Sequence, residues 1–407
     1  MTRLDDYRAV AGPFAAPKTS RAWNLYGAGL ENLRLEEAPV PELKDDELLA
    51  RIDAVGICAS DWKMIAQGQA HTRMRGLDLK THPTVPGHEV SLTIVKVGRA
   101  LKKKYKPGRR YAVQADIYVE GEGTAYGYKL RGADQQYQVL GPVIHAGGYL
   151  LEIDPDLGYS QAALAEPWAC VYQAYHHHRQ TRSVKPGGTA WYVGAGPLGL
   201  MHIEKGIQDG AAAVVVTEMK ADRLEKVRSA LALLAKAKGV RLDLVDLSRG
   251  PVDAVLTKGA VDDVLVLCPV ARAAEQALEY LGPNGYFNMF AGFPDREKAW
   301  CRVNLNDMHY GGWTLLATSG SSIEALRQAL GEAAAGKIDP NNAVACIGGI
   351  GAVKEGIHHT HEGTYPGRIV IYPHIEMALT PVERLTADGR WTKEAEAALL
   401  ESKLASP

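Results

Sequence analysis

A chain of 407 residues is long enough for two or three domains, and its hydrophobic content of 46% is ordinary for a globular protein. The 46 basic and 47 acidic residues nearly cancel, so charge favours neither nucleic acid nor an anionic membrane as a partner, and a small molecule fits better. The sequence shows no signal-peptide core and no long uncharged apolar stretch, which predicts a cytoplasmic location. Its five scattered cysteines include no CxxC pair and do not indicate a disulfide framework.

The N-terminal part of the chain contains two kinds of segment. Residues 1–20 show no clear periodicity and are expected to form an extension that packs on the surface or is partly disordered. From about residue 21, short β-branched or alternating segments such as ELLARIDAVGI and HEVSLTIVKVG are separated by Gly and Pro turns. This pattern predicts a β-rich domain.

A different pattern begins near residue 181, where strand, glycine turn, helix and strand alternate. Such alternation is typical of a parallel, doubly wound sheet, and it continues to about residue 336. The later strand GRIVIYPH is too short for a core of its own, so residues 337–407 are expected to rejoin the first domain and to end in a peripheral helical appendage. The sequence thus predicts an α/β protein with one domain at 21–180 and 337–407 and another at 181–336.

The segment YVGAGPLGL places Gly194, Gly196 and Gly199 in a GxGxxG motif, directly after an apolar strand and before a helical pattern. The first glycine allows a tight turn, the second lets backbone approach a pyrophosphate, and the third permits close helix–strand contact. The helix N-terminus attracts the phosphate charge. Pro197 and Leu198, inside the motif, belong to the predicted nucleotide contacts.

Glu218 ends the next predicted strand, 24 residues beyond Gly194, where a carboxylate would bind the adenosine ribose hydroxyls. A carboxylate there repels a 2′-phosphate, which favours NAD(H) over NADP(H). Lys220 and Arg223 follow closely and soften this preference, so NADP(H) stays open and Arg223 is counted among the predicted contacts. The alternative, a purely structural turn beside a surface glutamate, explains the sequence less well, because strand, glycine turn, helix, second strand and acidic residue follow in the order of a dinucleotide-binding unit.

Four side chains upstream of this motif have the chemistry of zinc ligands: Cys58, His88 and Glu89 in PGHEV, and Glu166 in ALAEPWACV. A thiolate, an imidazole and one or two carboxylates suit catalytic zinc, which keeps three protein ligands and an open fourth position. Each residue alone has an ordinary explanation, as a small buried hydrophobe, a locally bonded histidine or a helix cap. Together, ahead of a dinucleotide-binding pattern, they predict one catalytic zinc site.

The order Cys-x-Ser, Gly-His-Glu, Glu-Pro and GxGxxG resembles the zinc-dependent medium-chain dehydrogenase/reductase family, particularly its sorbitol dehydrogenase-like branch. The resemblance covers roughly residues 21–373. It implies a GroES-like catalytic domain interrupted in sequence by a Rossmann domain, with the active cleft between them. It also implies that the short C-terminal segment returns to the first domain.

Carried over position by position, the resemblance makes Cys58 and His88 zinc ligands and places Glu166 at the third ligand position. Glu89 matches an acidic residue that coordinates the metal in polyol dehydrogenases or exchanges with water. Which of the two glutamates binds in the resting state stays open at this point. Residues 116–140 contain none of the cysteines that hold structural zinc in many relatives, so one zinc per chain is expected.

Three further residues of CASDWK take roles from the same resemblance. Ser60 matches the hydroxyl residue that passes a proton from the alcohol, and Asp61 is placed to orient a ligand. Lys63 stands where many alcohol dehydrogenases have a relay histidine, and this departure leaves the outer proton path undefined. Ser319, in TSG, matches a Rossmann loop expected near the nicotinamide.

The implied activity is zinc-dependent hydride transfer between NAD(H) and a polyol or ketose, with a ketose phosphate such as L-sorbose 1-phosphate among the candidate substrates. The family also implies a homodimer or homotetramer. The alternatives are a secondary-alcohol or threonine-type dehydrogenase, and a nucleotide-sensing protein without catalysis.

Two other features have weaker functional interpretations. A basic group runs from Lys63 to Arg75, but such a run is more often a solvated loop than a phosphate site. Histidine runs at 175–180 and 358–361 suggest a second metal site, yet adjacent histidines on a helix point to different faces. The sequence therefore favours ordinary packing roles for these histidines.

Overall fold

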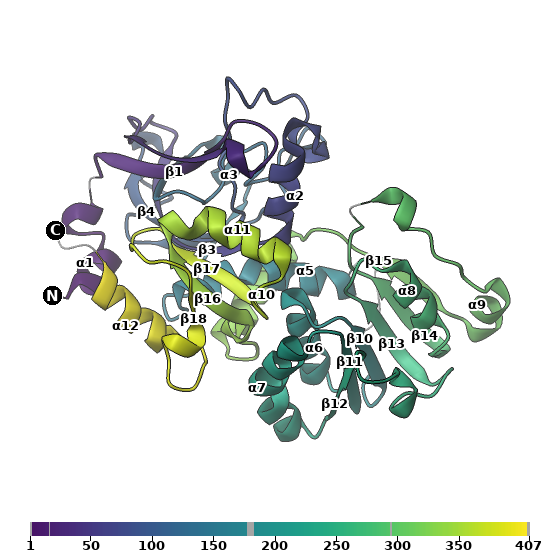
Figure 1. Cartoon of the computed structure of the whole chain (residues 1–407). Helices are drawn as coiled ribbons and strands as arrows, with labels where there is room; N and C mark the ends of the chain where they lie inside the picture. The colour runs from purple at the N-terminus through teal and green to yellow at the C-terminus, as the bar shows by residue number, and fades with distance from the viewer. Residues whose placement is uncertain (1, 16, 177–182, 294, 405–407) are drawn as a thin grey trace. The chain divides into compact units, whose positions relative to one another are not determined.

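The computed structural model describes residues 2–15, 17–176, 183–293 and 295–404 (Figure 1). The chain forms two compact units, the first made of Met1–Ala169 with Ser321–Pro407 and the second of Cys170–Gly320. None of the described helices is both long enough and apolar enough to cross a membrane.

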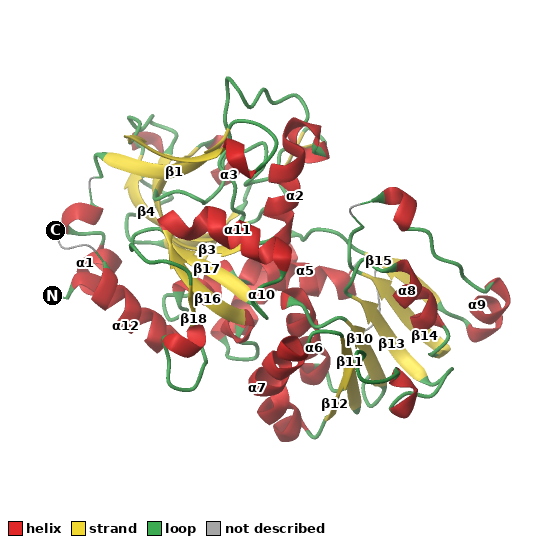
Figure 2. Cartoon of the chain, viewed as in Figure 1, coloured by secondary structure: helices red, strands yellow, loops and turns green. Residues whose placement is uncertain are grey.

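The first unit is built on an eight-stranded, mainly antiparallel sheet (Figure 2). Its strands, in spatial order, are β18 (Thr380–Pro381), β16 (Val344–Gly349), β17 (Arg368–Tyr372), β3 (Leu48–Ile57), β4 (Glu89–Val97), β5 (Arg110–Val113) and β9 (Leu150–Glu152), with β8 (Tyr137–Leu140) paired to β3. Two hairpins add β1 (Thr19–Leu25) with β2 (Leu33–Pro39), and β6 (Tyr118–Val119) with β7 (Glu122–Gly123). Every residue of β3 is buried, so this strand forms the centre of the unit's core.

Seven helices lie wholly within the described part of the first unit: α1 (Arg3–Ala9), α2 (Ala59–Gln67), α3 (Pro142–His145), α4 (Tyr159–Ala163), α10 (Ile323–Ala334), α11 (Val353–Glu362) and α12 (Lys393–Lys403). Helix α4 packs on β3 and β4, and α11 packs on α2, β3 and β17. Helix α2, which follows β3, is thereby packed against α11. Helix α5 (Ala165–His176) begins in this unit and continues into the second.

The second unit contains a six-stranded parallel sheet, which confirms the predicted doubly wound α/β fold. Its strands, in spatial order, are β12 (Arg241–Asp246), β11 (Ala213–Glu218), β10 (Thr189–Val193), β13 (Val261–Val266), β14 (Leu281–Met289) and β15 (Thr314–Ala317). Helices α6 (Pro197–Gln208) and α7 (Ala221–Lys238) pack against β10–β12, and α8 (Ala271–Leu278) packs against β13 and β14. The remaining described helix of the unit is α9 (Leu305–Gly311).

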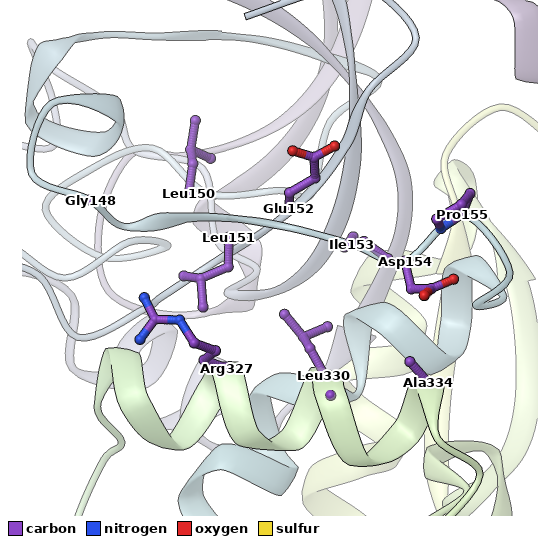
Figure 3. Close-up of a pocket in the computed structure, with 11 residues that line it drawn as sticks. Gly148, Leu150, Leu151, Glu152, Ile153, Asp154, Pro155, Arg327, Leu330 and Ala334 are labelled. Carbon is purple, nitrogen blue, oxygen red and sulfur yellow. The ribbon is translucent and has the colours of Figure 1, made fainter. Parts of the chain in front are cut away.

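The compact units differ from the expected domain borders at residues 180 and 337, because α10 belongs to the first unit. The Ser321 N–H donates to Asp116 Oδ2 at 2.8 Å, and Gln114 Nε2 donates to Ser321 Oγ at 3.0 Å. Figure 3 shows Arg327 and Leu330 of α10 facing β9 across a pocket of about 570 Å³. In sequence, α10 has the same helical pattern as the helices before it, so the border could not be seen there.

Both chain ends are more deeply packed than expected. Residues 3–9, expected to be a surface extension or partly disordered, form α1, and its Tyr7 is only 1% exposed. The Tyr7 hydroxyl donates to Asp53 Oδ1 at 3.0 Å, beside the buried Arg51–Asp53 ion pair. The extension therefore supplies a hydrogen-bond donor to a charged pair inside the core.

The C-terminal segment belongs to the first unit, where β17 pairs antiparallel with β3 and aligns Ile369 with Ile57. The last helix, however, is not a peripheral appendage. Glu396 of α12 is 3% exposed, and its carboxylate accepts backbone N–H groups from Tyr159 and Ser160 of α4. Sequence alone did not reveal this contact because the two segments lie far apart in the chain.

Candidate metal centre and nucleotide site

The antiparallel pairing of β3 with β4 brings together the side chains predicted to bind the metal. Gly56, near the end of β3, is aligned with Glu89, the first residue of β4. Cys58 follows β3 as the N-cap of α2, and His88 immediately precedes β4. Residues 30 positions apart in sequence therefore meet at one end of the strand pair.

The structure brings Cys58, His88 and Glu89 together, with one ligand atom of each lying within 4.8 Å of the others. His88 is 6% exposed and Glu89 is fully buried. Neither carboxylate oxygen of Glu89 has a hydrogen-bond partner among the described residues, although Arg368 Nη1 forms an ion pair with Oε1 at 2.9 Å. A thiol, an imidazole and an incompletely satisfied carboxylate at this spacing fit the ligand preferences of zinc.

Asp61 orients this cluster. His88 Nδ1 lies 3.0 Å from Asp61 Oδ1, while the Cys58 N–H donates to Asp61 Oδ2 at 2.8 Å. Because Nδ1 is occupied, Nε2 is the nitrogen left for the metal side, where Ser60 Oγ lies 3.3 Å away. These contacts fit the orienting role predicted for Asp61, and Ser60 lies at the cluster.

The electrostatic environment favours a thiolate. Burial opposes ionisation of Cys58, but Arg368 and His88 outweigh it and lower the pKa of the thiol well below its ordinary value. Burial also opposes protonation of His88, yet Asp61 and Cys58 raise the pKa of the imidazole well above its usual range. Both shifts favour the charged forms, a thiolate and an imidazolium, and a cation bound here would compete with the imidazolium proton.

Glu166 lies near the cluster but is not one of the three grouped residues. It sits in the first turn of α5, and burial raises the pKa of its carboxyl to about 7. After burial, the largest influences on this pKa are His88, which lowers it, and Cys58, which raises it, so Glu166 lies within electrostatic range of both. Glu166 therefore stays a predicted ligand, whereas Glu89 is already at the cluster.

Gly56 is a close-approach position at this site. A β-carbon built there would lie 2.2 Å from Glu89 Oε2 and 2.9 Å from Leu164 Cδ2. Both distances are below van der Waals contact, so any side chain at residue 56 would displace the Glu89 carboxylate or the end of α4.

Two residues of the site carried no clear signal in the sequence. Arg368, which pairs with Glu89, is the first residue of the distant strand β17. Tyr128 is buried, with its ring centroid 5.8 Å from that of His88 and 5.3 Å from that of His71. The only indication of Tyr128 was the glycine- and tyrosine-rich composition of its segment.

Lys63 is exposed on α2, beyond Ser60. The pKa of His71 is lowered by partial burial and by the charges of Arg73 and Lys63, so both cations lie within electrostatic range of His71. Arg73 forms an ion pair with Asp116 at 2.7 Å. Two members of the basic group, His71 and Arg73, thus lie at Tyr128, which borders His88.

The glycine motif forms a tight strand-to-helix turn in the second unit. Gly194 has a φ of +111°, a conformation that side chains disfavour, and Gly196 caps α6. A β-carbon at Gly199 would lie 2.5 Å from the Gly194 carbonyl oxygen, so the helix can approach the strand only with glycine there. Pro197 and Leu198 form the half-buried first turn of α6. This geometry is typical of a dinucleotide-binding turn.

Glu218 lies at the carboxyl end of β11, next to the glycine turn. Its carboxylate accepts the Ala195 N–H at 3.0 Å, and Arg223 Nη1 lies 3.4 Å from Oε2. Although burial opposes ionisation, the neighbouring N–H groups and Arg223 lower the pKa of Glu218 below its ordinary value. These contacts therefore favour the charged form of the Glu218 carboxylate beside the glycine turn. Ser319 is exposed, just beyond the carboxyl end of β15.

The histidine runs do not form a second cluster in the described part of the chain. His361 stacks on Trp62 with ring centroids 4.0 Å apart, and His359 faces Glu355 at 3.5 Å. Most of the run at 175–180 lies outside the described residues.

Comparison with known proteins agrees with this architecture. The alcohol dehydrogenase GroES-like domain model matches residues 44–172. The chain is 32% identical to the uncharacterized protein YggP of Escherichia coli K12, over 89% of this chain and 88% of that protein. It is 29% identical to the mannitol-1-phosphate 5-dehydrogenase of Aliivibrio fischeri, over 92% and 96% of the two chains. It is also 29% identical to the L-sorbose 1-phosphate reductase of Klebsiella pneumoniae, over 94% and 98%.

At 89% and 92% of this chain, the first two matches extend through both units, and the GroES-like model covers the residues of the candidate metal cluster. The chain belongs to the zinc-dependent medium-chain dehydrogenase/reductase family, and it is an NAD(P)-linked alcohol or polyol dehydrogenase that acts on CH–OH groups.

Proposed function

We propose that this enzyme interconverts a polyol phosphate and a ketose phosphate, such as L-sorbose 1-phosphate, with NAD(H) as the preferred cofactor. The observation that carries the proposal is a basic group around His71, which is connected to the metal-ligand cluster through the ring of Tyr128. Lys63 and Arg73 lie within electrostatic range of His71, whose ring neighbours Tyr128. Two relatives that align along nearly the whole chain are named for sugar-phosphate substrates, and this supports the same assignment.

Among these cations, Lys63 is the best placed to bind a phosphate. Its side chain is exposed and forms no ion pair with any described residue, whereas Arg73 is already paired with Asp116. A phosphate attracts ammonium groups strongly through charge-assisted hydrogen bonds. We therefore assign Lys63 the main phosphate contact and Arg73 a supporting charge.

The residues around the metal cluster also suit proton transfer. A zinc ion held by Cys58, His88 and one of Glu89 and Glu166 would supply Lewis acidity toward the substrate oxygen, while the nicotinamide would supply or accept the hydride. Asp61 holds the His88 tautomer that leaves Nε2 facing the metal side. The Ser60 hydroxyl, 3.3 Å from that nitrogen, is placed to take a proton from the substrate hydroxyl or return it.

Turnover of matched substrate pairs tests the phosphate assignment. We expect kcat/KM for a ketose 1-phosphate to exceed that of the free ketose, and Lys63→Ala to reduce this ratio by roughly 10- to 100-fold, the value of a hydrogen bond to a charged group. Because this ratio compares two substrates of the same variant, any loss of proton transfer that slows both reactions equally cancels out. The exposed Lys103 provides a matched control, since Lys103→Ala should leave the ratio unchanged. Equal efficiency of wild-type enzyme with both substrates would refute the proposal, and a panel including secondary alcohols and threonine would identify the alternative.

The preference for NAD(H) is tested at Glu218. We expect Glu218→Ala to weaken NADH binding by roughly 10-fold or more, because hydrogen bonds to a charged group are lost, and to improve the relative affinity for NADPH. Fluorescence titration with both nucleotides measures the ratio. Glu225→Ala, which removes an exposed carboxylate on α7 that pairs only with Arg228 among the described residues, serves as control. An unchanged NADH-to-NADPH ratio in Glu218→Ala would show that this carboxylate does not select the cofactor.

We also propose that the enzyme is a homodimer or homotetramer. Three large side chains of the second unit support this: Trp300 is 75% exposed, Leu305 69% and Tyr310 81%. Exposed apolar groups of this size favour contact with another protein surface. The edge strand β15, close in sequence to all three, also offers unpaired backbone groups.

A further inference from the structure

We propose that Glu396, on the C-terminal helix α12, is a positioning residue for the metal centre. Its buried carboxylate holds the start of α4 and the end of β17, and through them it sets the places of Glu166 and Arg368. This inference rests on the proposed metal role of Glu166. Figure 1 shows α12 beside α1, at the edge of the first unit.

The Glu396 carboxylate is satisfied by three donors from two elements. The N–H groups of Tyr159 and Ser160, the first two residues of α4, donate to it at 2.6 and 2.7 Å. The Tyr372 hydroxyl, at the end of β17, donates at 2.7 Å and itself accepts the Trp391 indole N–H at 3.0 Å. A carboxylate at a helix start satisfies N–H groups that have no partner within the helix.

Helix α4 leads directly to the predicted ligand. Its C-cap is Leu164, and α5 begins at the next residue with Glu166 in its first turn. The Leu164 N–H donates to the Ser160 carbonyl at 2.9 Å, so the two ends of this short helix move together. Leu164 also lies against Gly56, opposite Glu89, where no space remains for a side chain. A displacement of the α4 start would therefore be passed on to both glutamates.

The second connection runs along β17. Tyr372 is the last residue of this strand and Arg368 is the first, and Arg368 Nη1 pairs with Glu89 at 2.9 Å. One carboxylate of α12 is thus bonded to the two segments that deliver a carboxylate and a guanidinium to the metal centre. A carboxylate that served only to cap α4 would need only the hydrogen bonds from the α4 N–H groups and not the one from β17.

Another glutamate of the same helix provides a matched control. Glu401 also accepts two backbone N–H groups, from Leu4 at 2.8 Å and Arg3 at 3.3 Å, at the start of α1. Helix α1 contributes no residue to the metal cluster. Glu401→Ala therefore removes a comparable helix cap from α12 without touching the route to Glu166.

The experiment compares Glu396→Ala and Glu396→Gln with Glu401→Ala and Glu166→Gln. We expect Glu396→Ala to lower zinc affinity, measured by chelator competition, by about 10-fold or more, the usual effect of losing a group that orients a metal ligand. Glu396→Gln keeps one acceptor oxygen and should fall between Glu396→Ala and wild type. NADH affinity should be unchanged in both variants, and Glu401→Ala should bind zinc like wild type. The visible spectrum of the Co²⁺-substituted protein should shift in the Glu396 variants only.

Each contrary outcome has a definite meaning. Suppose that folded Glu396→Ala keeps the zinc affinity and Co²⁺ spectrum of the wild type, while Glu166→Gln loses zinc affinity. This result would overturn the positioning role of Glu396 and leave the metal proposal standing. Unchanged affinity in Glu166→Gln would remove the ligand role of Glu166 and overturn the positioning role through it. If Glu396→Ala does not fold, Glu396→Gln decides by the same two readouts. An equal zinc loss in Glu401→Ala would show that α12 acts only through general stability.

Discussion

Replacing Cys58 with alanine is expected to remove zinc and to lower kcat by about 10³-fold or more, since Lewis-acid stabilisation by a metal contributes several kcal/mol. The substitution deletes one of three ligand atoms that lie within 4.8 Å of one another. NADH affinity should be unchanged, because the glycine turn belongs to the other compact unit. Metal content by mass spectrometry, turnover followed at the NADH absorbance and NADH fluorescence titration provide the three measurements.

Cys346 serves as the control for this prediction. It is fully buried in β16 of the same unit and is not part of the metal cluster. Cys346→Ala should lower the free energy of unfolding through lost packing while keeping zinc and turnover. Full turnover by Cys58→Ala would exclude Cys58 as an essential ligand.

Replacing Arg368 with leucine is expected to lower the free energy of unfolding of the metal-depleted protein by up to about 3–5 kcal/mol. Burial raises the pKa of Glu89 well above its usual value and Arg368 opposes this rise, so without Arg368 the carboxyl must either stay buried as an unpaired charge or take up a proton. Glu89 is fully buried and Arg368 is 4% exposed, so little water can screen the loss. Urea unfolding of the metal-depleted protein measures the change. In the Arg368→Leu background, Glu89→Gln should recover part of the stability, since it removes the unpaired charge.

A surface ion pair of the same unit sets the scale for this loss. Arg109 pairs with Glu152 at 3.1 Å, and both side chains are more than half exposed. Arg109→Leu should cost less than about 1 kcal/mol. If Arg368→Leu costs no more than this control, the Arg368–Glu89 pair does not stabilise the core.

The alternation of strand, glycine turn and helix was readable because it depends on neighbouring residues. Gly194 needs a positive φ and Gly199 lies against the Gly194 carbonyl, so the motif follows from local geometry that few other residues allow. Cys58 and His88 were also predictable, since a thiol and an imidazole flanking two apolar strands meet when those strands pair. Spacing and residue chemistry were sufficient for these features.

The partners from distant parts of the chain were decided by tertiary packing. In the sequence, Arg368 looks like an ordinary charged residue beside an apolar strand, yet it pairs with Glu89. Glu396 looks like an ordinary charged residue on an amphipathic helix, yet it accepts the hydrogen bonds that hold the start of α4. Glu89, rather than Glu166, lies in the ligand cluster because the β3–β4 register places it opposite Gly56. The sequence by itself determined the fold class, the glycine turn and the chemical types of the predicted metal ligands. Only the tertiary structure decided which charges meet, because contacts between distant segments depend on how the whole core packs and leave no local pattern.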